Sequence, residues 1–257
     1  MSGPGRGDAF FIGWVPRLPD GLHGFLSLVA GASLVGMALA ALLLSASVDD
    51  SGGGDFDWAA GERTLRGTLV DAPYPVLHLP PDAAHPRGHA VLLSGLGKSG
   101  VDADPALAAR VVDATGLMLK RGTLDMMQVG DAPGLRAVES AASAPPSPPA
   151  DAEPLGRWRI TGEICDGKCW IGAMRPGSGV AHRACASLCL VGGIPPVFVA
   201  TGAVAGSPYL LLAGADGGRM PESLLRFVGL RVRLDGEVER RGDLLVFRAD
   251  PASAELP

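Results

Sequence analysis

The sequence predicts a mainly β protein in which one N-terminal transmembrane helix precedes two small β-barrels. Three observations support this prediction. An uncharged apolar run occupies residues 24–48, short runs of alternating apolar residues begin at Thr64, and several segments of the first half return in the same order in the second half. The 257 residues are enough for two modest domains after the helix.

The apolar run is long enough to cross a bilayer, since a helix rises about 1.5 Å per residue and the hydrocarbon core is about 30 Å thick. We therefore expect a transmembrane helix at residues 22–48. Arg6 and Arg17 precede it, whereas acidic residues follow it. Because basic flanks stay in the cytoplasm, residues 1–21 are expected to form a cytoplasmic leader, and all later residues to lie on the periplasmic or extracellular side of the inner (plasma) membrane.

Two further features bear on this segment. Phe10, Phe11 and Trp14 resemble the aromatic belt that often lies at a membrane surface. A cleaved secretory signal is the alternative, because Ser45, Ala46 and Ser47 are small enough for a signal peptidase. The long leader and long apolar core favour an uncleaved anchor. In both cases the globular part is exported, and its cysteines meet an oxidising compartment.

Segments of the two halves correspond. RGTLVDAPYPVL from Arg66 corresponds to TGEICDGKCWIG from Thr161, and HAVLLSG from His89 corresponds to PYLLLAG from Pro208. A third pair starts at Gly116 and Gly229. We therefore predict one domain at residues 62–130 and a second at residues 157–250, joined by a Pro/Ala-rich linker at residues 131–156.

Each copy is expected to run strand, strand, strand, helix, strand, strand, which is the order of an OB-like β-barrel. Asp104-Pro105 and Pro221-Glu222 are helix-start signals between the third and fourth strands. Apolar residues recur at helical spacing after each signal. They are Leu107, Val111 and Val112 in the first copy and Leu224, Leu225 and Val228 in the second. Such a helix would plug the barrel end. A β-sandwich of no particular type is the alternative.

The second copy differs by a helical Cys/His insertion at residues 166–193, which carries or adjoins all four cysteines. His182, Cys185 and Cys189 stand at i, i+3 and i+7, so on a helix they form one stripe that Cys169 can reach from the preceding turn. Three thiolates and one imidazole suit zinc, or copper if Met174 adds a soft ligand. The cofactor is thus expected to be zinc or copper.

Two other states of the cysteines remain open. One or two disulfides could staple the insertion to the barrel, most plausibly from the Cys165/Cys169 segment to the Cys185/Cys189 helix. Alternatively, Cys185 and Cys189 could be a redox-active thiol pair. Cys165 is the cysteine that the metal site needs least and is a possible secondary ligand or disulfide partner.

The residues of this insertion carry a resemblance. GEICDGKCWIG, the sequence around His182, Cys185, Ala186 and Cys189, and the following GGIPP are similar to a Cys…His-x-x-Cys-Ala-x-x-Cys pattern. This pattern is seen in a group of uncharacterised exported or membrane-anchored bacterial proteins. The match covers about residues 161–197. It implies an exported location and a cysteine and histidine site, without implying a reaction.

Several functions are disfavoured. The net charge of −5 argues against nucleic acid, which is bound by basic surfaces. Gly97-Lys98-Ser99 lacks the first glycine of a phosphate loop and is interpreted as a turn, so we expect no nucleotide. His78, His85 and His89 could attract a metal only if they converge.

The chain has no Gly-x-Ser-x-Gly or His-Glu-x-x-His motif, which favours a non-catalytic role. The leading hypothesis is a membrane-anchored extracytoplasmic accessory protein that binds a metal or redox centre and assists a membrane redox system, with a cell-envelope protein as its partner. The alternative is a disulfide-stapled, non-catalytic interaction module of the envelope.

Overall fold

The computed structural model describes residues 21–47, 53–130, 134–138 and 152–257. The chain divides into two compact units, residues 1–50 and residues 51–257, and each is described by itself. Nearly all of the predicted leader, including Phe10, Phe11 and Trp14, lies outside the described residues. The same holds for residues 131–133 and 139–151 of the predicted linker.

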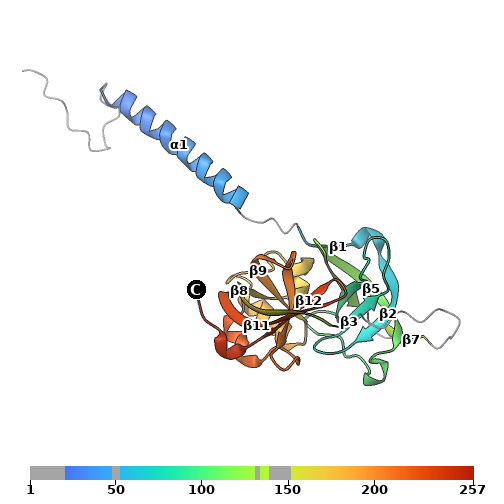
Figure 1. Cartoon of the computed structure of the whole chain (residues 1–257). Helices are drawn as coiled ribbons and strands as arrows, with labels where there is room; N and C mark the ends of the chain where they lie inside the picture. Colours follow the sequence, from blue (N-terminus) through green and yellow to red (C-terminus); the bar gives the residue numbers. More distant parts are fainter. Residues whose placement is uncertain (1–20, 48–52, 131–133, 139–151) are drawn as a thin grey trace, which may run out of the picture. The chain divides into compact units, whose positions relative to one another are not determined.

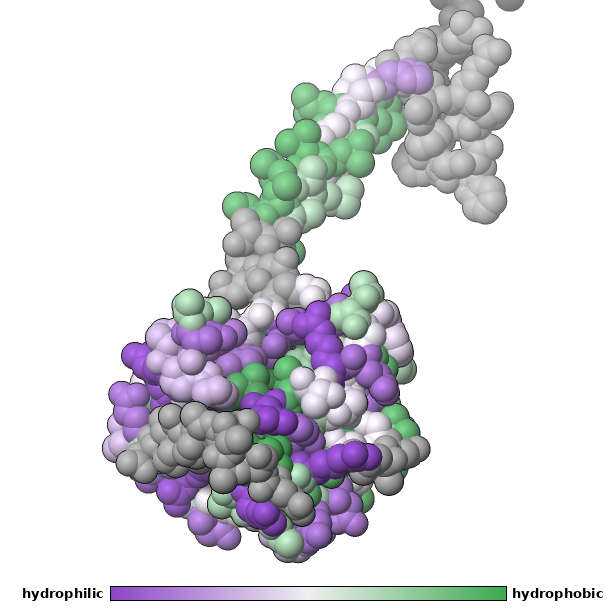
Figure 2. Space-filling view, turned by 90° about the vertical axis from the view of Figure 1, so that its right-hand side faces the viewer, coloured by the Kyte–Doolittle hydropathy of each residue, from purple (hydrophilic) through white to green (hydrophobic). Residues whose placement is uncertain are grey.

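The first unit contains helix α1, which spans Leu22–Ser47 and agrees closely with the predicted transmembrane segment. Its stretch Leu22–Leu44 has a mean hydropathy of 2.2, and none of it is buried inside the protein. Figure 2 shows mostly apolar side chains over the surface of this helix. The helix is therefore long and apolar enough to span a membrane.

The second unit begins with a closed five-stranded barrel, barrel 1 (Figure 1). Its strands are β2 (Glu62–Val70), β3 (Val76–Leu79), β4 (His89–Ser94), β5 (Val111–Arg121) and β6 (Leu124–Val129). The strand β2 pairs with β3 and β5, while β4 pairs in parallel with β6. Two short strands, β1 (Asp55–Phe56) and β7 (Leu135–Ala137), extend the sheet along β5.

Barrel 2 repeats this arrangement. Its strands are β8 (Glu153–Asp166), β9 (Pro196–Val204), β10 (Ser207–Gly214), β11 (Arg231–Arg241) and β12 (Leu244–Ala249). The first strand, β8, again pairs with the second and the fourth, and the third, β10, pairs in parallel with the fifth, β12. Both barrels therefore have the strand order 1-2-3-5-4-1, and the predicted OB-like fold is confirmed.

For barrel 1, the prediction of a helix between the third and fourth strands is wrong. Only a 3₁₀ turn, η2 (Pro105–Leu107), lies there, and Val111 and Val112 belong to β5. Burial along β5 alternates residue by residue, so the two valines follow the period of a strand and not that of a helix. β-branched residues also favour strands. In barrel 2 the 3₁₀ helix η4 (Glu222–Phe227) takes the predicted place and buries Leu224 in the barrel core.

The connection between the two barrels differs from the predicted linker. Part of the predicted linker is β-strand, since β7 lies within it and β8 starts at Glu153 instead of residue 157. The early start of β8 reflects its partner, because Glu153 and Pro154 pair with β11. The insertion between β8 and β9 contains the helical turn η3 (Cys169–Ala173) and the helix α2 (Arg183–Val191).

The two barrels pack against each other through a shared apolar core. In β4, Val91 and Leu93 fill the interior of barrel 1, whereas Ala90 and Leu92 belong to a cluster that also contains residues of barrel 2. The strands β10 and β12 divide their side chains in the same way. All six residues of β4 are buried as a result. Burial on both faces explains why these strands are continuous apolar runs.

The core of barrel 2 gives a stability prediction. Phe247 is fully buried, and its ring centroid lies 5.4 Å from that of Phe198. Replacing Phe247 by alanine leaves a cavity and should reduce the free energy of unfolding by about 3–5 kcal/mol in chemical denaturation. The matched control is Leu256→Ala, because Leu256 is 62% exposed and should change the same quantity by less than about 0.5 kcal/mol. Equal effects of the two substitutions would contradict the packing described.

Candidate metal centre

The candidate site forms where β8 ends. Asp166 is the last residue of β8, and Gly167 follows in a tight place where a Cβ atom would lie 2.8 Å from the Pro195 carbonyl oxygen. The chain then enters η3, which presents Cys169. Helix α2 presents Cys185 and Cys189 on one face, since residues four apart lie one above the other.

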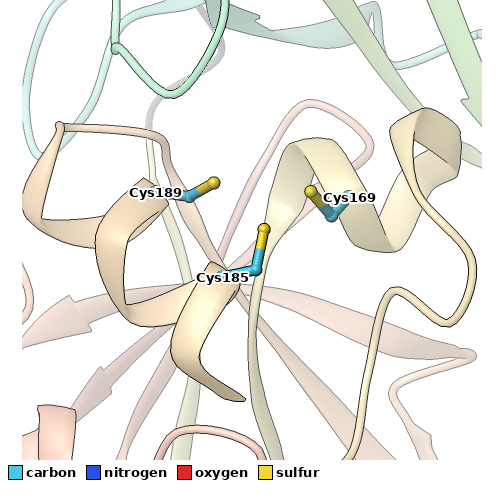
Figure 3. A group of neighbouring side chains, drawn as sticks. All are labelled: Cys169, Cys185 and Cys189. Carbon is cyan, nitrogen blue, oxygen red and sulfur yellow. The ribbon is translucent and has the colours of Figure 1, made fainter. Parts of the chain in front are cut away.

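Three sulfurs converge between these elements. The Sγ atoms of Cys169, Cys185 and Cys189 all lie within 4.8 Å of one another. Figure 3 shows Cys169 from the η3 turn facing the two cysteines of α2. Cys169 and Cys189 are buried, whereas Cys185 is partly exposed. Thiolate sulfurs bind zinc at a Zn–S distance of about 2.3 Å, so two sulfurs on one ion lie at most about 4.6 Å apart. Only small movements of the three side chains would therefore allow all three sulfurs to bind the same ion.

His182 belongs to an adjoining group. Its Nε2 atom lies 3.1 Å from Asp166 Oδ2, and the ligand atoms of Asp166, Cys169 and His182 lie within 4.8 Å of one another. The backbone N–H of Cys169 donates to Asp166 Oδ1 at 2.8 Å. The three predicted sulfur ligands thus come together, and His182 reaches their edge next to Cys169. Among the described residues, no such group contains all four predicted ligands.

Asp166 organises the turn. It is fully buried, and a buried carboxylate needs partners to offset its lost hydration. The Cys169 N–H and the His182 imidazole supply them. Asp166 therefore links the start of α2 to the turn that carries Cys169, in the manner of the outer residues that orient metal ligands in proteins.

Barrel 1 contributes the loop Gly95–Gly100 to the site. The Lys98 Nζ atom lies 2.7 Å from Cys185 Sγ and 3.8 Å from Cys189 Sγ. The Gly100 N–H donates to the Gly192 carbonyl at 2.8 Å, and a Cβ atom on Gly192 would lie 2.1 Å from the Lys98 carbonyl oxygen. Glycine at residue 192 thus permits the loop to approach the end of α2. The sequence around Lys98 predicts only a turn and does not indicate this contact.

Lys168 binds the backbone of this loop. Its side chain is buried, and its Nζ atom donates to the carbonyls of Gly95 and Gly97 at 2.7 and 3.0 Å. Burial lowers the pKa of Lys168. The loop is therefore fixed at both ends, and two lysines stand near the cluster.

The sulfurs differ in acidity. The Cys189 pKa is lowered to about 7, mainly because the Cys169 thiol donates a hydrogen bond to its sulfur and because Lys98 is near. The same hydrogen bond, together with burial, raises the pKa of Cys169. The Lys98 pKa is raised by its contact with Cys185. The cluster therefore favours the thiolate at Cys189, which is the form of cysteine that binds metals.

The two secondary residues lie elsewhere. Cys165 is buried in the core shared by the barrels, 3.4 Å from Glu163 Oε1, and its pKa is raised by burial and by that carboxylate. Met174 is half exposed at the end of η3. Among the described residues, Cys165 belongs to none of the groups of cysteine, histidine and acidic side chains that could hold a metal. All four cysteines are free in the structure, which shows no disulfide of the alternative that the sequence left open.

A second group lies at another point of the contact between the barrels. The ligand atoms of His85, His89 and Asp243 lie within 4.8 Å of one another, beside a pocket of about 420 Å³. His89 is already engaged, since its Nδ1 lies 2.6 Å from Asp243 and its Nε2 lies 3.1 Å from Asp125. His78 lies outside this group and is buried, and its pKa is lowered to about 4 by burial and by Arg241. Two of the three predicted histidines thus converge.

Comparison of the chain with protein-family models, with curated proteins and with solved structures finds no match. The function must therefore be argued from the geometry of the site.

His89 gives a pH prediction. Burial alone would lower its pKa, but hydrogen bonds and charge from Asp125 and Asp243 outweigh burial and raise it to about 9, from an ordinary value of 6.5. The charged His89 therefore stabilises the fold fully below pH 6.5, and this contribution is lost as the pH rises through 9. We expect the free energy of unfolding of the native chain to fall by about 2 kcal/mol more than that of His89→Gln over this range.

Urea denaturation at a series of pH values measures this difference. The cysteines titrate equally in both proteins, so their contribution cancels in the comparison. Parallel stability curves for the native chain and His89→Gln would show that His89 carries no net charge effect.

Proposed function

We propose that the protein is a membrane-anchored extracytoplasmic accessory protein whose cysteine cluster binds a soft metal ion. The observation that carries the proposal is the convergence of Cys169, Cys185 and Cys189 within 4.8 Å. Thiolates at this spacing are ligands for zinc and for copper(I). Two of the three sulfurs are buried, which limits access of water to a bound ion.

The surroundings suit such an ion. Three thiolates with a divalent ion carry one negative charge, and with a monovalent ion they carry two. Lys98, at 2.7 Å from Cys185 Sγ, and the nearby Lys168 offset this charge. His182 and Asp166 lie next to Cys169. They serve either to orient Cys169 or, for an ion that needs four ligands, to supply the fourth.

The proposed place of action follows from the N-terminal segment. Helix α1 meets the length and hydropathy of a membrane anchor. Arg6 and Arg17 precede it and acidic residues follow it, which supports an orientation with both barrels outside the cytoplasm. A metal site on a membrane-anchored chain suits an accessory subunit of a membrane redox system, with an envelope protein as its partner.

The close contact of Cys169 with Cys189 favours thiol redox chemistry as a second candidate function. The hydrogen bond from Cys169 lowers the pKa of Cys189 to about 7, which favours its thiolate. A catalytic thiol pair would cycle between dithiol and disulfide. The stapled, non-catalytic module receives less support, because all four cysteines are free.

Metal binding by the full chain in detergent, purified under reducing conditions, tests the proposal. We expect one equivalent of zinc or copper(I) per chain by elemental analysis after dialysis against a weak chelator. The single replacements Cys169→Ala, Cys185→Ala and Cys189→Ala should each abolish retention, because each removes one of three sulfur ligands.

The matched control is Cys165→Ala, because this buried cysteine lies outside the cluster and its loss should leave metal retention unchanged. Absence of bound metal in the native chain would refute the proposal. If rapid thiol reactivity at Cys189 accompanied that absence, thiol redox chemistry would become the leading function.

The role of His182 is tested separately. If Asp166 and His182 only orient Cys169, both Asp166→Asn and His182→Ala should weaken metal affinity by about 10–100-fold without changing the ligand set. X-ray absorption spectra of the native chain would then show sulfur neighbours and no histidine nitrogen. A nitrogen neighbour that disappears in His182→Ala would instead make His182 a ligand.

A further inference from the structure

The contact between Lys98 and Cys185 is unusually close. The Nζ to Sγ distance of 2.7 Å is at the short end of N–H···O hydrogen bonds, although sulfur is larger than oxygen. The nitrogen and the sulfur are therefore separated by a gap that one covalently bonded oxygen atom would span. Lys98 comes from barrel 1 and Cys185 from α2 of barrel 2, 87 residues later.

We propose that Lys98 and Cys185 form a reversible covalent N–O–S cross-link between the two barrels under oxidising conditions. The bridge would consume the sulfur of Cys185. Its regulatory effect, which is to switch metal binding off, rests on the proposed function of the cluster. The bridge itself requires only the lysine, the cysteine and an oxidant.

Dioxygen is the simplest oxidant, and the reaction then balances as R–NH₂ + R′–SH + O₂ → R–NH–O–S–R′ + H₂O. An N–O and an O–S bond form, while the O–O bond, one N–H bond and the S–H bond break. Nitrogen and sulfur each lose two electrons, and dioxygen takes up all four. The second oxygen atom leaves as water with the two hydrogens.

The bridge is reversed by thiols. Four equivalents of a small thiol return the amine, the cysteine and one water, and they leave as two disulfides. This reversibility separates the bridge from the sulfinic and sulfonic acids, which ordinary thiols do not reduce.

The surroundings select this pair. Lys98 is exposed and Cys185 is partly exposed, so an oxidant can reach both, whereas Cys169 and Cys189 are buried. The other two lysines of the chain are placed differently, because Lys168 is held by the carbonyls of Gly95 and Gly97 and Lys120 lies near Asp125. Cys189 is also farther from Lys98, at 3.8 Å.

The backbone on both sides is fixed. The Gly100 N–H to Gly192 carbonyl bond joins the loop to the end of α2, and Lys168 holds the start of the loop. A bridge therefore forms between two groups that already face each other, so little conformational freedom is lost when it closes. It would lock the Gly95–Gly100 loop over the cysteine cluster.

Peptide mapping by mass spectrometry tests the bridge. The full chain, metal-free in detergent, is exposed to air or to a few equivalents of hydrogen peroxide and then digested without reductant. We expect a cross-linked peptide pair containing Lys98 and Cys185, heavier than the sum of the two peptides by one oxygen less two hydrogens. Dithiothreitol should restore the separate, unmodified peptides.

Variants make the assignment specific. Lys98→Met and Cys185→Ala should abolish the cross-link, while Lys120→Met, at an exposed lysine on the far end of β5, should retain it. Lys98→Met keeps all four thiols, so its thermal unfolding and thiol count check that the fold is intact. Oxidation of the native chain that yields only disulfides or a sulfinic acid on Cys185, with no link to Lys98, would overturn the proposal.

The same proteins separate this inference from the proposed function. Lys98 offsets charge at the cluster but is not a proposed ligand, so reduced Lys98→Met should bind metal more weakly than the native chain and in the same ratio of ions to chains, whether or not a bridge forms. If the bridge forms in a chain that retains no metal when reduced, the cross-link is confirmed, and the proposals of metal binding and of its regulation by the bridge are refuted. If both stand, the oxidant should release a larger share of the metal bound by the reduced native chain than of the metal bound by reduced Lys98→Met.

Discussion

The packing of barrel 1 against barrel 2 is the constraint on which the candidate site depends. Strands β4, β10 and β12 bury side chains on both faces, one face in their own barrel and the other in the shared core. This burial removes a large apolar area from water and fixes the two barrels relative to each other. Only then does the Gly95–Gly100 loop reach the end of α2 and place Lys98 against Cys185.

Within barrel 2, one buried carboxylate organises the cysteines. The Asp166 side chain is fully buried and needs hydrogen-bond partners, which the Cys169 backbone and His182 provide. His182 therefore contacts Asp166 at the end of β8. The two cysteines of α2 face the η3 turn instead (Figure 3). Of the three residues expected to form one stripe on the helix, Cys185 and Cys189 join the sulfur cluster, and His182 supports it through Asp166.

Two of the proposed chemistries compete for the sulfur of Cys185. As proposed, Cys185 would bind a metal together with Cys169 and Cys189, or it would react with Lys98. The contact of Cys169 with Cys189 would support thiol exchange as a third, separate chemistry. Because the lysine comes from the other barrel, the contact between the barrels would determine which chemistry occurs. A site built from one barrel alone would lack this control.

Local periodicity in the sequence determined the helix α1 and the placement of Cys185 and Cys189 on one helix face. The repeated order of segments in the two halves indicated the strand order of both barrels. The sequence failed at Val111 and Val112, because a short apolar spacing fits both a helix and a strand, and pairing with β2 decides between them. Tertiary structure alone decided that Lys98 meets Cys185, that Cys165 turns into the shared core and that His182 meets Asp166. The first two depend on how the barrels pack and the third on how α2 folds back onto the end of β8, and neither leaves a periodic signal in the chain.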